Sequence, residues 1–148
     1  MAGQPPALDL SREAAIQKLI VKLIRDGLVD SAHDCSEGGL AITLAECTFD
    51  SGGIGVVADI ATGDGGPFGA NAALFGESAS RIVVSLPEKQ LDAVTAAAKA
   101  AGVTATVIGK SGGDRIQLTV GGRPAIDSNV SDAEQAWATA IATQMGRR

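Results

Sequence analysis

Aromatic side chains are scarce in this sequence. They make up 3% of the 148 residues, and tyrosine is absent. The core must therefore be built from Ala, Val, Ile and Leu, while the 19 glycines allow backbones to pack closely. This composition favours an α/β protein, and the length suits a single domain over residues 1–148 with a substantial core.

Cysteine and histidine are also scarce. The two cysteines, Cys35 and Cys47, and the single histidine cannot make a metal cluster of the usual spacing. Two free thiols are typical of a reducing compartment. No hydrophobic run approaches the ~20 residues of a membrane span, and the first residues lack the basic and apolar regions of a signal peptide. We therefore expect a soluble, cytoplasmic protein without membrane contact.

Positive charge is in the minority, since 12 Lys and Arg face 17 Asp and Glu and give a net charge of −5. A nucleic-acid partner needs clustered basic residues, so this balance argues against one. A compact local site for a phosphate group stays compatible with it.

Hydrophobic periodicity predicts alternating helices and strands. Apolar positions recur at helical spacing from Leu10 to Ile24, with Asp9 or Ser11 as the cap and Gly27 as the stop. Further helices are expected at 39–49, 88–101 and from 131 onward, and strands at 28–33, 54–60, 82–86, 103–108 and 115–120. The order strand-helix-strand occurs twice, which predicts a split βαβ, ferredoxin-like sheet with extra helices at both ends.

Several local details accompany this prediction. Residues 103–108 and 115–120 are expected to pair as a hairpin, residues 62–69 to form a loop and residues 121–124 to form a turn. Ser131 and Glu134 resemble a capping box at the start of the last helix. Trp137 and Ile141 are expected to form a buried stripe on that helix.

The first motif, residues 32–46, begins with a strand that runs through a Gly38-Gly39 turn into a helix. Free N–H groups and the positive dipole end of a helix converge at such a junction and favour an anion. In an extended strand, Asp34 and Ser36 share one face, and His33 faces the other way. We therefore do not expect a catalytic pair between His33 and Asp34.

Two interpretations of the first motif stay open from the residues alone. Asp34 can be a Mg²⁺ ligand while Ser36 contacts a phosphate held at the helix start. Alternatively, Ser36 only caps the helix, Gly38 and Gly39 only make the turn, and Asp34 is a solvated carboxylate.

The second motif, residues 74–81, precedes a strand and combines the flexible Gly76 with four polar side chains: Glu77, Ser78, Ser80 and Arg81. Strand ends in α/β sheets often display binding groups. The alternative is a polar turn with a surface ion pair between Glu77 and Arg81.

The ordered pair of motifs, AHDxSxGGLAxxLAE and LFGESxSR, resembles the C-terminal domain of phosphoribosylformylglycinamidine synthase, the PurL-type subunit within the AIR synthase-related superfamily. The resemblance covers about residues 4–145. It implies a fold like the PurM C-terminal domain. It also implies the ATP-dependent conversion of formylglycinamide ribonucleotide and glutamine-derived ammonia to formylglycinamidine ribonucleotide, with ADP and phosphate as the other products.

The same resemblance implies roles for residues of both motifs. Asp34 matches a Mg²⁺ ligand, and Ser36, with Gly38 and Gly39, matches the contacts to ATP or ADP. The second motif matches substrate or interface contacts through Glu77, Ser78, Ser80 and Arg81. The catalytic histidine of the family lies in preceding domains and is not His33.

The implied partners are the upstream synthetase domains, a glutaminase subunit and a small PurS-type subunit. We expect the chain to be a fragment of a longer synthetase that is inactive alone, and an exposed sheet edge to favour a homodimer. Two alternatives stay open: the domain of another ATP-dependent enzyme of the same superfamily, or a non-catalytic module for nucleotide binding or oligomerisation.

Overall fold

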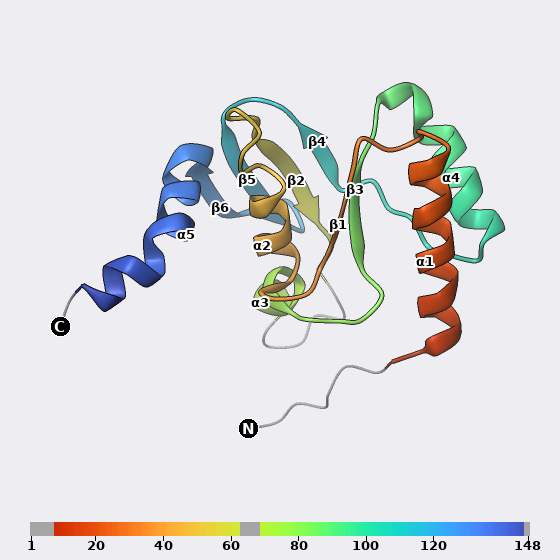
Figure 1. The fold of residues 1–148 in the computed structure, drawn as a ribbon, viewed down its shortest axis with the longest axis horizontal. Helices are drawn as coiled ribbons and strands as arrows, with labels where there is room; N and C mark the ends of the chain where they lie inside the picture. The colour runs from red at the N-terminus through yellow and green to blue at the C-terminus, as the bar shows by residue number, and fades with distance from the viewer. Residues whose placement is uncertain (1–7, 63–68, 147–148) are drawn as a thin grey trace. The chain divides into compact units, whose positions relative to one another are not determined.

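The computed structural model describes residues 8–62 and 69–146, whose contacts divide the chain into two compact units (Figure 1). Of the described residues, 8–39 and 77–107 form unit 1, and 40–62, 69–76 and 108–146 form unit 2. Most of the loop expected at 62–69 lies outside the described residues. No helix of the described chain is both long enough and apolar enough to cross a membrane.

Unit 1 begins with α1 (Leu10–Arg25), as the apolar spacing predicted. The carboxylate of Asp9 caps the helix by accepting the backbone N–H groups of Ser11 at 2.9 Å and Arg12 at 3.1 Å. Gly27 then turns the chain with a φ of 66°, a conformation that glycine adopts without steric cost. The predicted helix, its cap and its stop are confirmed.

The sheet of unit 1 consists of β1 (Ser31–Asp34) and β3 (Ile82–Ser85), which pair antiparallel. Asp34 at the end of β1 lies opposite Ile82 at the start of β3. A short 3₁₀ turn, η1 (Glu88–Gln90), then leads into α4 (Leu91–Ala100), where the sequence predicted a helix.

Helices α1 and α4 enclose the core of unit 1 and lie side by side (Figure 1). The buried members of the cluster are Leu19, Leu23, Val94 and Ala98. Leu28 and Val29 pack against this cluster, and the strand predicted at 28–33 begins only at Ser31.

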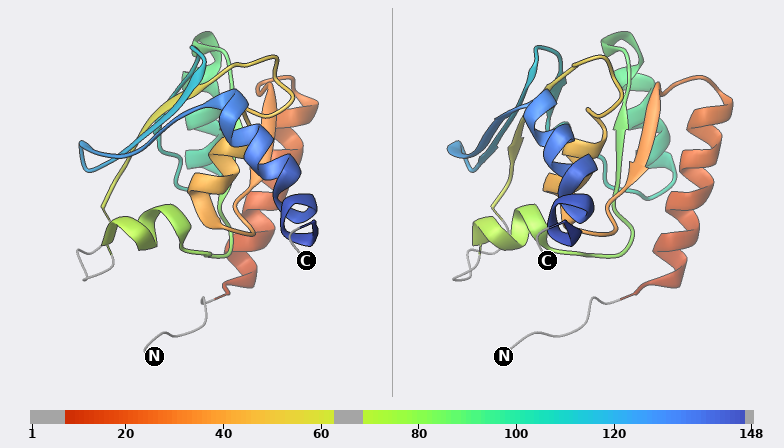
Figure 2. Two further views of the ribbon diagram at one scale, coloured as in Figure 1. Left: turned by 90° about the vertical axis from the view of Figure 1, so that its left-hand side faces the viewer. Right: turned by 60° about the vertical axis from the view of Figure 1, so that its left-hand side comes forward.

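Unit 2 contains a four-stranded sheet with the order β4-β2-β5-β6. Its strands are β2 (Val56–Ile60), β4 (Gly109–Ser111), β5 (Arg115–Val120) and β6 (Arg123–Asn129). Strand β2 pairs parallel with β5 and antiparallel with β4, and β5 and β6 form a hairpin. The helices of this part are α2 (Gly39–Glu46), α3 (Gly69–Phe75) and α5 (Val130–Met145), and α5 continues directly from β6 (Figure 2).

Two strand predictions were wrong. Residues 103–108 contain no strand. Val103 packs against the core of unit 1, and β4 begins only at Gly109. The expected hairpin between 103–108 and 115–120 does not form either, since β2 lies between β4 and β5. Strand β6 was missed because Pro124 indicated a turn. Pro124 pairs with Thr119 beside a register shift, and a sheet tolerates proline at such an irregularity.

Helix α5 forms where the last helix was expected, but the capping box and the buried stripe predicted for it were wrong. Glu134 accepts the backbone N–H of Asp50 at 3.0 Å, and no side-chain hydrogen bond caps the start of α5. Trp137 is 60% exposed and Ile141 75% exposed, and the Trp137 ring contacts Phe49 with 5.6 Å between centroids. Val130 at the helix start is the buried residue, at 2% exposure.

The mixed α/β class with flanking helices is confirmed. The described strands are divided between a two-stranded and a four-stranded sheet, where the sequence analysis expected one split βαβ sheet. The site residues that the sequence analysis selected from the two motifs all lie in unit 1.

Candidate functional site

Asp34 and Ser36 meet just after β1, as the alternation of an extended strand predicted. The Ser36 hydroxyl donates a hydrogen bond to Oδ2 of Asp34. This bond is the main cause that lowers the pKa of the Asp34 carboxyl, with a smaller contribution from His33. The Asp34 side chain is 68% exposed, so an ionised, oriented carboxylate faces solvent at the end of the strand.

His33 contacts the backbone of its neighbour more closely than it contacts the carboxylate. Its Nδ1 lies 2.8 Å from the carbonyl oxygen of Asp34 and 3.9 Å from Oδ1 of the same residue. The second distance exceeds that of a hydrogen bond. The imidazole is therefore held at the end of β1 by a main-chain oxygen.

The Gly38-Gly39 turn leads into α2. Gly38 and Gly39 have φ values of 79° and 68°. Glycine adopts this left-handed conformation without steric cost, which explains two successive glycines in the turn. The backbone N–H of Gly38 donates to Oε1 of Glu77 at 3.0 Å. A carboxylate thus meets a free N–H group at the start of a helix, where negative charge is favoured.

The first two residues of the second motif are the last two of α3. A side chain at Gly76 would clash with the carbonyl oxygen of Ala72, which explains the glycine at this position. Beyond it, the carbonyl oxygen of Arg81 accepts the backbone N–H of Cys35 at 3.0 Å. Ser78, between these contacts, is exposed. The structure therefore brings the two motifs together, a connection that the sequence analysis did not predict.

Ser80 adds a third connection, this time to α1. Its φ of 63° lies in the left-handed region, which is uncommon for serine. Its hydroxyl donates to Oε2 of Glu13, and this bond, followed by one from Gln17, lowers the pKa of the Glu13 carboxyl. Sequence analysis missed Glu13, because a glutamate on the surface of an amphipathic helix carries no local signal of a site.

The oxygen donors of Asp34 and Ser36 suit a hard cation such as Mg²⁺, which prefers carboxylate and phosphate oxygens. Within the described residues, no three His, Cys, Asp or Glu side chains gather as a metal site. A cation bound at Asp34 would therefore take most of its ligands from a bound phosphate group and from water.

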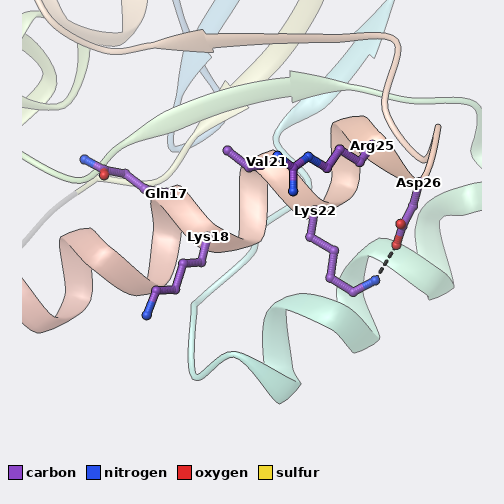
Figure 3. A pocket seen from close by; sticks show the side chains of 6 residues that line it. All are labelled: Gln17, Lys18, Val21, Lys22, Arg25 and Asp26. Carbon is purple, nitrogen blue, oxygen red and sulfur yellow. Dashed lines mark hydrogen bonds and ion pairs between the residues drawn. The ribbon is translucent and has the colours of Figure 1, made fainter.

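A surface depression on α1 is lined by residues that belong to neither motif (Figure 3). It is lined by Gln17, Lys18, Val21, Lys22, Arg25 and Asp26. Lys22 and Asp26 form an ion pair across it. None of these residues belongs to the first or second motif, so the depression gives no support to a site there.

These observations describe a mixed α/β domain with a glycine-rich junction between a strand and a helix. The chain belongs to the family described as AIR synthase related protein, C-terminal domain, whose model matches residues 2–121. The family expected from the two motifs is thereby confirmed.

Two relatives share the same name. The phosphoribosylformylglycinamidine synthase subunit PurL of Moorella thermoacetica is 39% identical over 147 residues, which are 99% of this chain and 19% of the relative. The subunit of the same name from Salinibacter ruber is 43% identical over 129 residues, 86% of this chain and 17% of the relative. The chain thus spans about a fifth of the length of the relatives it matches.

Solved structures share the fold. A structure described as T. maritima PurL complexed with ADP has a TM-score of 0.74 at 16% identity, covering 86% of this chain and 22% of that chain. The structure of PurLQS from Thermotoga maritima has a TM-score of 0.72 at 17% identity, covering 84% and 22%. At such identities the likeness establishes the fold alone.

Proposed function

We propose that this chain is the C-terminal domain of a phosphoribosylformylglycinamidine synthase. In the full synthetase, ATP would drive the conversion of formylglycinamide ribonucleotide and glutamine-derived ammonia to formylglycinamidine ribonucleotide. The observation that carries the proposal is 39% identity to a PurL subunit over 99% of the chain. Residues 1–148 would form one AIR synthase-related domain of a longer enzyme.

Within that enzyme, the first motif would hold a magnesium nucleotide. The proposed ligand of Mg²⁺ is Asp34, and the proposed contacts to the phosphates of ATP or ADP are Ser36, Gly38 and Gly39. The Ser36 hydroxyl orients the Asp34 carboxylate and favours its ionised form, which is the form that binds a cation. The bound Mg²⁺ would neutralise phosphate charge. Solved structures described as T. maritima PurL complexed with ATP and with ADP support a nucleotide ligand.

For the second motif we propose contacts to substrate or to a domain interface through Glu77, Ser78, Ser80 and Arg81. Glu77 and Ser80 already bond to Gly38 and Glu13, so any such contact through them would be shared with an internal role. Ser78 is exposed and available to a ligand.

The proposed partners are the upstream synthetase domains, a glutaminase subunit that supplies ammonia and a small PurS-type subunit. The relatives are named as subunits, and one solved structure is described as PurLQS, which supports an assembly. We also propose a homodimer of this chain, because β1 and β3 form a sheet of only two strands within the described residues. We also propose a cytoplasmic location, because a sequence with only two cysteines is typical of a reducing compartment.

A chimeric synthetase tests the proposed reaction. In it, this sequence replaces the matching fifth of the M. thermoacetica subunit, and formation of the amidine is measured with ammonia as the nitrogen source. We expect the chimera to be active and Asp34→Asn to abolish most of the activity. Asp30→Asn, which alters another exposed carboxylate of unit 1, should keep it.

Two results would count against the proposal. A folded chimera without activity would mean that the chain does not serve this reaction. Full activity of the Asp34→Asn chimera would mean that the site at Asp34 is auxiliary rather than catalytic, as in a non-catalytic nucleotide-binding module.

A further inference from the structure

We infer that residues 77–81 are a clamp that positions residues 35–38, and that Glu77 positions Gly38 within it through a hydrogen bond. The inference deepens the proposed function, because residues 35–38 include Ser36, the proposed phosphate contact. The hydrogen bonds from residues 35–38 to residues 77–81 do not depend on a bound nucleotide.

The clamp contacts residues 35–38 at both ends. At one end, the carbonyl oxygen of Arg81 accepts the N–H of Cys35 at 3.0 Å. At the other end, Oε1 of Glu77 accepts the N–H of Gly38 at 3.0 Å. Ser36 lies between these two fixed positions, and its hydroxyl bonds to Asp34. The placement of the Ser36 hydroxyl therefore depends on two acceptors that the second motif supplies.

The clamp is itself anchored to α1. Ser80 adopts a φ of 63°, a conformation that costs a serine energy and persists only where surrounding contacts hold it. The bond from its hydroxyl to Glu13 is such a contact. Glu13 thus acts on the first motif indirectly, because it holds Ser80, which belongs to the same clamp as Glu77.

What Glu77 supplies to Gly38 is one acceptor oxygen. A glutamine at this position offers an equivalent oxygen without the charge, whereas alanine offers none. A glutamate that coordinated a cation or a charged substrate would fail in both variants. The comparison of Glu77→Gln with Glu77→Ala therefore separates positioning from charge.

The first experiment uses the chain without ligand. Backbone order parameters of Cys35, Ser36 and Gly38 are measured by ¹⁵N relaxation in the wild type, Glu77→Ala, Glu77→Gln and Glu88→Ala. Glu88, an exposed glutamate of unit 1, is the control. We expect Glu77→Ala to lower these values from about 0.85 toward 0.6, and the other two variants to match the wild type. Unchanged values in Glu77→Ala, or equal loss in Glu77→Gln, would overturn the inference.

The second experiment adds MgADP and measures the dissociation constant by calorimetry. We expect Glu77→Ala to weaken binding by about tenfold, the size of a lost hydrogen bond to a charged group, and Glu77→Gln to retain wild-type affinity. Loss in both variants would show that Glu77 acts through its charge, and tighter binding in Glu77→Gln would show that it competes with phosphate. Either result overturns the positioning role. If the wild-type chain binds no MgADP, the proposed nucleotide site fails, while the relaxation experiment still decides the clamp.

Discussion

The side chain of Glu77 accepts a hydrogen bond from the backbone N–H of Gly38, at 3.0 Å and across 39 positions of the sequence. This bond joins the two motifs that the sequence displays separately. It places a carboxylate at the start of α2, where the helix dipole favours negative charge. Ser36 lies between this contact and the hydrogen bond from Cys35 to the carbonyl oxygen of Arg81.

The hydrogen bond from Ser36 to Asp34 should be visible in a titration. It is the main cause of the lowered pKa of Asp34, so Ser36→Ala should raise that pKa toward its ordinary value. The carboxyl ¹³C shift of Asp34 followed by NMR across acidic pH measures it. Thr95→Ala, which removes a hydroxyl of α4, is the control. An Asp34 pKa that is unchanged by Ser36→Ala would contradict the geometry.

Acid should destabilise the fold through several carboxyl groups. The pKa values of Glu13, Asp34, Asp59 and Asp127 are lowered, in each case chiefly by a side-chain hydrogen-bond donor. A carboxyl whose folded pKa is depressed stabilises the fold above its unfolded pKa of about 4 and loses that contribution as pH falls through the folded pKa.

We therefore expect the urea concentration at the unfolding midpoint to be lower at pH ~3 than at pH ~7. Asp127→Asn should reduce this dependence, because Arg115 donates to Oδ1 of Asp127 at 2.7 Å in the β5–β6 hairpin. Midpoints that are equal at the two pH values would argue against these lowered pKa values.

The core of unit 1 should be sensitive to truncation. Leu23 is 2% exposed within the α1–α4 cluster, so Leu23→Ala should lower the free energy of unfolding by about 2–5 kcal/mol. The adjacent Ile24 is 54% exposed, and Ile24→Ala should change it by about 0.5 kcal/mol or less. Urea denaturation followed by circular dichroism compares the pair. Similar losses for both variants would place the core elsewhere.

Helix α5 should exchange its amide protons rapidly. All residues from 135 to 146 are exposed, and the ring contact between Trp137 and Phe49 buries little of the helix. A helix of this length with so little tertiary packing is marginal in water. Amides of 135–145 should therefore exchange faster than those around Ile16 and Leu23 of α1, as measured by hydrogen–deuterium exchange. Equal protection in the two helices would show that α5 is covered in solution, for example by a second copy of the chain.

Local patterns predicted the parts of the structure that depend on neighbouring residues. The spacing of apolar residues and the Asp9 cap gave α1 its bounds, and the alternation of a strand placed Asp34 beside Ser36. The bond from Gly38 to Glu77 could not be predicted in this way, because it depends on how β1 and β3 pair. Glu13 was missed because its bond to Ser80 spans 67 positions of the sequence and leaves no local signal on α1.

Other errors have composition as their cause. Helix α5 is rich in Ala and Thr and has no charged residue from 135 to 145, so its sequence does not show which face, if any, is buried. Trp137 and Ile141 were therefore placed in the core although they are exposed. Strand β6 was missed because Pro124 indicated a turn. The strand accommodates this proline beside a register shift, where its missing N–H is tolerated.

The most direct test of the central claim, that residues of this chain bind a magnesium nucleotide, is thermal unfolding with and without Mg²⁺ and ADP. Ligand at a hundred times its dissociation constant stabilises a protein by about 2.7 kcal/mol, which raises the midpoint by several degrees in a domain of this size. We predict a rise that requires Mg²⁺, disappears in Asp34→Asn and persists in Asp30→Asn. No rise in the wild type, or an equal rise in Asp34→Asn, would contradict the claim.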